Sequence, residues 1–145
     1  MTDRFTYTLH HLVDAVDAHA DRLLAAHHGD LTFSQFVFLA VLEDTQPQDV
    51  TRLAECLGVS KAAVSKRVPG LVARGLVHAE PDPANARRVV LSLTEAGARL
   101  ARDAGDLLDR ELTALFAGVP GVDVARTHAD LRAMLAAVPT TAPGR

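Results

Sequence analysis

The central segment of the chain reads Leu53-Ala54-Glu55-Cys56-Leu57-Gly58-Val59-Ser60-Lys61-Ala62-Ala63-Val64-Ser65-Lys66. This pattern is typical of two short helices joined by a tight turn. Ala54 is small enough for two helices to cross closely, and Gly58 tolerates the positive φ that the turn requires. We expect Val59 to fill the space between the helices. Ser60 can cap a second helix that ends before Gly75, so the segment predicts a helix-turn-helix.

The second helix of this pair, over 60–74, has two distinct faces. Its core side is predicted to hold Val64, Val68, Leu71 and Val72. The outward side then holds Ala62, Lys66, Pro69 and Gly70, flanked by Lys61 and Ser65. Small side chains accompanied by two lysines suit close approach to the major groove of DNA, where the N-terminal end of such a helix contacts base edges.

The charge distribution supports this interpretation. The net charge of the 145 residues is −3, which gives no indication of nucleic-acid binding. Residues 51–75, however, hold five basic side chains against one acidic, a net of +4, whereas residues 1–50 hold two basic against eight acidic, a net of −6. A local basic patch matters more to a polyanion than the total charge. The alternative is a solvated helix face that happens to be basic.

Two helices are predicted upstream of the helix-turn-helix, whose own first helix spans 50–57. Apolar residues recur at 3–4 spacing from Leu9 to Leu24, and Gly29 follows as a stop. Thr32 and Gln35 have the spacing of a capping box for a helix that ends by Thr45. Asp49 is placed to cap a short helix over 50–57.

Downstream, the sequence predicts a hairpin and two more helices. Strand-like residues at 76–78 and 88–93 flank turn residues, which places the tip of the hairpin near 82–87. Arg87 and Arg88 would reach phosphates or the minor groove from this hairpin. Thr94 caps a long helix to about 116, and a last helix ends at Pro139. The predicted fold is mainly α with a small β-hairpin wing.

Several of these residues resemble a known family. The positions that match its recognition helix and first wing strand are Ser60, Ala63-Val64-Ser65-Lys66, Val68, Leu71 and Gly75-Leu76-Val77. Arg87, Leu93-Thr94 and Gly97 resemble its wing signature. On these residues the chain is similar to MarR-type regulators, and the order of helices agrees over roughly 5–138.

The resemblance implies one MarR-like domain over 1–145. Residues 5–30 and 117–138, with part of 94–116, would be dimerisation helices, and 32–93 would be a winged helix-turn-helix DNA-binding region. It implies a homodimeric transcriptional regulator that reads a pseudo-palindromic operator in double-stranded DNA through helix 60–74 and wing 78–92. A ligand-responsive repressor is the expected type, with an acid or phenolic inducer bound between helices 5–28 and 94–116.

The resemblance also implies roles for individual residues. Bases would be contacted by Lys61, Ala62, Ser65 and Lys66, phosphates by Ser60 and Arg67, and the wing arginine would be Arg87, with Arg88 beside it. The chain departs from the family pattern at Asn85, where an aspartate is usual. It also departs at Pro69, which removes a backbone hydrogen bond and predicts a kink. Arg67 and Val72 stand where the pattern has an apolar and an acidic residue.

The sequence also offers alternatives to a DNA-binding function. Five histidines lie in or at the end of the first helix, which suggests a zinc-responsive regulator. About two helical turns separate His11 from His19 and His19 from His27, however, and this is too far for two of them to bind one zinc ion. Cys56 is the single cysteine and is expected to be a packed, inert thiol. No catalytic motif is present, so no enzyme and no cofactor are predicted. A winged helix that docks on a protein is the remaining alternative.

The expected location is the cytoplasm. The start of the chain lacks the pattern of a signal peptide, and one cysteine excludes an internal disulfide framework. The longest apolar run, 36–42, is too short to cross a membrane.

Overall fold

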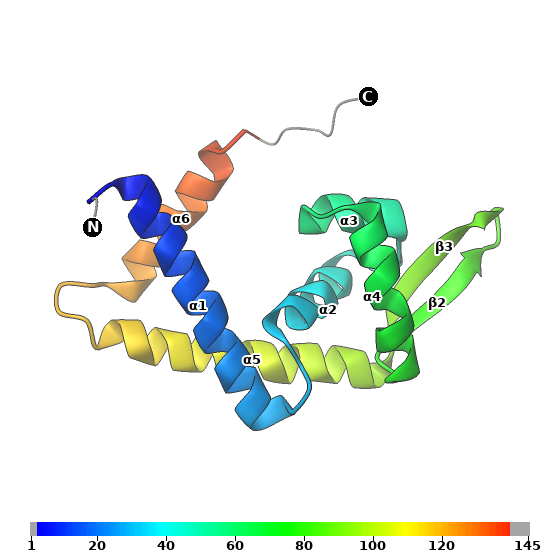
Figure 1. Cartoon of the computed structure of the whole chain (residues 1–145), viewed down its shortest axis with the longest axis horizontal. Helices are drawn as coiled ribbons and strands as arrows, with labels where there is room; N and C mark the ends of the chain where they lie inside the picture. The colour runs from blue at the N-terminus through cyan, green and yellow to red at the C-terminus, as the bar shows by residue number, and fades with distance from the viewer. Residues whose placement is uncertain (1–2, 140–145) are drawn as a thin grey trace. The chain divides into compact units, whose positions relative to one another are not determined.

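A computed structural model describes residues 3–139 and shows helices with one small sheet (Figure 1). The helices are α1 (Phe5–His28), α2 (Phe33–Thr45), α3 (Val50–Leu57), α4 (Lys61–Ala73), α5 (Glu95–Ala117) and α6 (Val124–Ala137). The strands are β1 (Gln48–Asp49), β2 (Val77–Asp82) and β3 (Asn85–Leu93). The mainly helical fold with a hairpin wing is confirmed. The chain divides after Leu108 into two compact units, which are described separately.

The ends of α1 and α2 follow the predicted local signals. Gly29 adopts a φ of 61° directly after α1. Thr32 and Gln35 form the predicted capping box: the Thr32 hydroxyl accepts from the Gln35 N–H at 3.1 Å, and the Gln35 side chain accepts from the Thr32 N–H at 3.1 Å. Asp21 of α1 accepts from the Phe33 N–H at 2.7 Å, so the start of α2 is tied to α1.

The helix-turn-helix also forms as predicted. The Asp49 side chain caps α3, the Ser60 side chain caps α4, and Gly58 takes the left-handed conformation in the turn. Helix α4 ends in a Schellman motif, because the N–H of Leu76 donates to the Leu71 carbonyl at 3.0 Å. Gly75, at the turn of this motif, has a φ of 71°. Helix α4 continues through Pro69.

The sheet contains one strand that the sequence did not indicate. Strand β3 lies between β1 and β2, antiparallel to both. Strand β1 has only two residues, too few to produce an alternating pattern. The predicted tip at 82–87 was too broad, because the turn consists of Pro83 and Ala84, and β3 begins at Asn85 and not at 88. In Figure 1 the hairpin extends beside α4.

The core of the first unit draws on every helix from α1 to α5 and on both hairpin strands. Its fully buried large side chains are Leu24, Leu31, Phe38, Leu39, Leu42, Leu53, Val64, Val77 and Leu91. Two predictions were wrong at its edge. Val72 is exposed, since it lies at the flank of the apolar stripe of α4. Val59 is 36% exposed and lines a surface recess together with Leu57, so it does not fill the space between the helices.

The start of α5 lies tightly against the chain leaving α4. The Thr94 hydroxyl accepts from the Gly97 N–H at 2.9 Å, as predicted for a cap, and donates to the Gly75 carbonyl at 2.6 Å. A Cβ on Gly97 would lie 2.0 Å from the Leu76 carbonyl oxygen. Glycine is therefore required here by close approach of the backbone.

The second unit consists of the end of α5 and of α6. Asp123 caps α6 by accepting from the Arg126 N–H at 3.0 Å. Helix α6 has no buried residue, although it carries several large apolar side chains. No helix within residues 3–139 is long and apolar enough to span a membrane.

Candidate nucleic-acid interface

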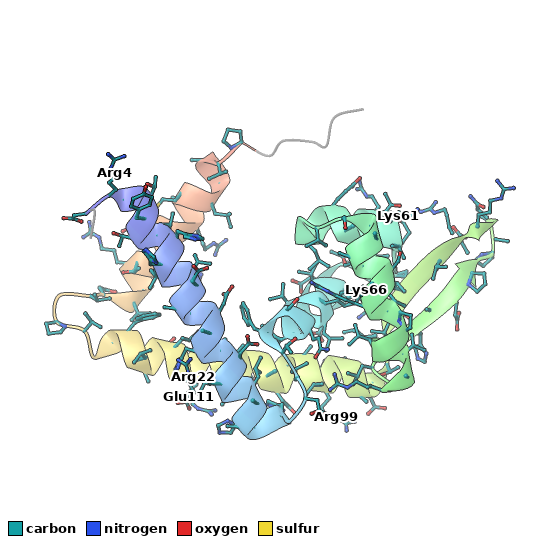
Figure 2. The ribbon with its side chains drawn as sticks, in the orientation of Figure 1. Arg4, Arg22, Lys61, Lys66, Arg99 and Glu111 are labelled. Atoms are coloured by element: carbon teal, nitrogen blue, oxygen red, sulfur yellow. The ribbon has the colours of Figure 1, made fainter. Side chains whose placement is uncertain are left out.

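Helix α4 presents the face that was predicted to read DNA. Lys61 lies at its first turn and Lys66 about halfway along it (Figure 2). Both lysines are exposed, as are Ser60, Ala62 and Ser65. Val64 and Val68 are buried on the opposite side, so the core fixes which side of the helix faces solvent.

A surface recess of about 480 Å³ lies between α3, α4 and the wing. It is lined by Asp49, Val50, Thr51, Arg52, Lys61, Ser65, Arg87, Arg88 and Val89. Four of the eight predicted site residues therefore meet here, although Lys61 and Arg87 lie far apart in the sequence. The lining holds four cationic side chains and one carboxylate, which favours an anionic partner such as a DNA phosphate.

The two wing arginines have different surroundings. Arg87 is exposed and, within residues 3–139, makes no ion pair. Its backbone N–H donates to the Asn85 side chain at 3.1 Å, so the residue that replaces the usual aspartate holds the backbone and not the guanidinium. Arg88 instead pairs with two carboxylates, those of Asp49 and Asp82, the latter with an Nε–Oδ2 distance of 3.8 Å.

Asp49 therefore serves two groups at once. Its carboxylate accepts from the Arg52 N–H at 2.8 Å as the cap of α3, and it pairs with Arg88 of β3. The hydrogen bond from the Arg52 backbone, assisted by the Arg88 guanidinium, holds the pKa of Asp49 below its usual value. The cap was predicted from the sequence. The pairing with Arg88 was not, because it depends on β1 pairing with β3.

Arg67 points to a different place. It lines a second recess, of about 300 Å³, whose other walls come from α1, α2 and the helix-turn-helix turn. The lining consists of Asp17, Asp21, Phe33, Ser34, Val37, Leu57, Val59 and Arg67. The structure does not bring Arg67 together with Lys61, Ser65 and Arg87.

The metal alternative gains no support from the geometry. Within residues 3–139 no three His, Cys, Asp or Glu side chains are grouped as metal ligands. Cys56 is exposed, so its expected burial was wrong, because it lies outside the buried part of α3, which is Leu53 and Ala54. The Arg52 guanidinium forms an ion pair with the Glu55 carboxylate, with an Nη1–Oε2 distance of 3.4 Å.

Comparison with known proteins places this region in a family. Residues 29–88 match the model of the MarR family. The chain is 41% identical over 70 residues, 48% of its length, to the HTH-type transcriptional repressor NicR of Pseudomonas putida. This match covers 44% of NicR, so the chain spans about half the length of that relative. That relative is named a transcriptional repressor.

Solved structures show the same fold over most of the chain. The apo MarR structure from E. coli has a TM-score of 0.80 at 23% identity, covering 93% of this chain and 99% of that one. The repressor CouR bound to a 23-mer DNA duplex has a TM-score of 0.79 at 23% identity, covering 92% and 91%. The segment that matches the MarR family, residues 29–88, encloses both the helix-turn-helix and the start of the wing, and the chain has the winged-helix fold of these MarR-type structures.

Proposed function

We propose that this protein is a DNA-binding transcriptional regulator that reads double-stranded DNA with α4 and its wing. The observation that carries the proposal is the cationic recess between α4 and β3, which brings Lys61, Ser65 and Arg87 to one surface. The exposed residues Ala62 and Lys66 would contact bases, and Ser60 a phosphate. We do not assign Arg88 or Arg67 to DNA contacts.

Repression is the mode of action that we favour. NicR is named a transcriptional repressor, and CouR is a repressor whose structure contains DNA. Access to DNA also agrees with the cytoplasmic location that the sequence predicts.

The regulator would act as a homodimer. Helix α1 exposes large apolar residues along one stretch: Phe5, Tyr7, Leu9, Leu12 and Val13. Helix α6, considered separately, exposes Leu131, Met134 and Leu135 and buries none. Surfaces of this kind are typical of protein interfaces. A dimer would place its two α4 helices in successive major grooves, about 34–36 Å apart, on a pseudo-palindromic operator.

The resemblance implies an effector between helices 5–28 and 94–116, but we place the effector site instead in the recess lined by Arg67, which has no wall from α5. A phenolic ring would pack against Phe33 and Val37, and its hydroxyl would donate to Asp17 or Asp21. The recess is lined by residues of α1 and α2 and by residues at the turn between α3 and α4. A ligand that binds one arrangement of these helices more tightly would change the affinity for DNA.

The test is fluorescence anisotropy with two duplexes of equal length, one from the region upstream of the protein's own gene and one scrambled. Tight binding to the first alone, weakening steeply with salt, is the expected result. Equal and salt-insensitive binding to both would contradict the proposal and favour a protein-docking winged helix. An effector would be recognised by release of the bound duplex.

A further inference from the structure

We infer that Asp49, Arg88 and Asp82 form a latch that positions the wing against the helix-turn-helix, and that Arg88 is a positioning residue and not a DNA contact. The inference rests on the proposed DNA-binding function and adds to it. The three residues come from β1, β3 and β2, one from each strand of the sheet.

The latch joins two parts of the DNA-binding region. Asp49 belongs to the start of α3 because its carboxylate accepts from the Arg52 N–H at 2.8 Å. Through Arg88 the same carboxylate reaches β3, where Asp49 is also the register partner of Val90. The wing is thereby attached to the helix whose first turn forms a wall of the recess.

The surroundings of Arg88 limit its use elsewhere. Its guanidinium faces two carboxylates, and the side chain of Asp49 is only 11% exposed. Moving Arg88 to a phosphate would leave a largely enclosed carboxylate without its cation. Arg87, which makes no ion pair within residues 3–139, is free to contact DNA.

This assignment leads to an expectation opposite to that of simple electrostatics. Asp49→Asn removes a negative charge from a DNA-binding surface, which by itself strengthens DNA binding. If the carboxylate positions the wing, the same substitution weakens specific binding. Asparagine is as good a helix cap as aspartate, so α3 keeps its cap and the chain keeps its fold.

A matched control is available on the same helix. Glu55→Gln also removes one carboxylate, but Glu55 pairs with Arg52 of α3 and not with the wing. Each variant raises the net charge by one unit, Asp49→Asn at the N-cap of α3 and Glu55→Gln within α3. Only Asp49→Asn opens the latch.

The first experiment uses the protein without DNA, so its outcome does not depend on the proposed function. Amide hydrogen exchange over residues 77–93 should quicken several-fold in Asp49→Asn and in Arg88→Gln, and stay unchanged in Glu55→Gln. Unchanged exchange in the two latch variants, with α3 protection retained, would overturn the latch.

The second experiment measures the anisotropy of the two duplexes. Asp49→Asn and Arg88→Gln should each lower the ratio of specific to scrambled affinity about tenfold, and the double variant should lose no more than either single one. Arg88→Lys should restore part of the ratio. Glu55→Gln should bind equally well or more tightly. Tighter specific binding by Asp49→Asn, or additive losses in the double variant, would overturn the positioning role of Arg88.

Discussion

A methyl group at residue 97 would meet the backbone of Leu76, between α4 and β2. The nearest atom, the Leu76 carbonyl oxygen, would lie 2.0 Å away, and the same oxygen accepts from the Thr94 N–H at 3.0 Å. Neither segment has room to move, because both belong to the core. We expect Gly97→Ala to lower the free energy of unfolding by about 3 kcal/mol or more, measured by urea denaturation.

Gly105 provides the control in the same helix. A Cβ there would lie 3.6 Å from the Phe36 ring, which is ordinary contact. Gly105→Ala should therefore leave stability unchanged or raise it by up to about 1 kcal/mol, through the helix preference of alanine. Equal losses at both positions would mean that close approach at Gly97 is not the cause.

Asp49 makes a prediction about pH. Its pKa is lower in the folded protein than its usual value, chiefly through the hydrogen bond from the Arg52 N–H. The stabilisation is therefore present above the unfolded pKa of about 3.9 and is lost as pH falls through the folded pKa. The stability difference between the wild type and Asp49→Asn should shrink from pH 6 to pH 3 in urea titrations. A constant difference across this range would contradict the assignment.

On the scale of one element, α4 exposes a row of small and basic residues that belongs to the proposed interface. Lys66→Ala should weaken binding to the upstream duplex by about 1–3 kcal/mol if Lys66 contacts a base. Anisotropy at several salt concentrations measures this loss and the salt slope. Arg99→Ala, which removes an equal charge from α5 (Figure 2), should change neither. Equal losses in both would indicate a general charge effect.

The elements also show where sequence reasoning succeeds. The caps at Thr32, Asp49 and Ser60 and the stop at Gly75 depend on residues within one turn, so they are predictable from neighbours in the chain. Strand β1 pairs with residues far along the chain, Gln48 with Leu91 and Asp49 with Val90. The ion pair between Asp49 and Arg88 joins residues 39 positions apart, so no local sequence pattern predicts either feature.

Errors of burial have a related cause. Helical periodicity predicts on which side of a helix a residue lies. At the edge of the buried side it does not predict whether another element covers that residue. Val72 and Cys56 lie at such edges and proved exposed. The eight predicted site residues were split for the same reason, since Arg67 turns toward α1 and α2, where a second recess lies.

At the scale of the whole molecule, the exposed apolar side chains of α6 fit the interface of the proposed dimer. Leu135 is 75% exposed, an unfavourable state for so large an apolar side chain in an isolated chain. Leu135→Glu should shift the protein from dimer to monomer in sedimentation velocity at micromolar concentration. Val72→Glu, an exposed valine of α4, should leave the assembly unchanged. A dimer that persists in Leu135→Glu would place the interface elsewhere.

The hairpin is anchored at its root, where the Leu93 N–H donates to the Gln46 side chain at 2.7 Å and Thr94 donates to the Gly75 carbonyl. It is braced further out at Arg88, and only residues 83–87 extend beyond that brace. A structural change at the tip of this hairpin would therefore have little effect on its anchored base. Mutations or small insertions at the Pro83–Ala84 turn would therefore alter the groove contacts of descendant proteins while the core stays intact. In the proposed complex, the DNA preference would therefore change through the wing tip while the fold is retained.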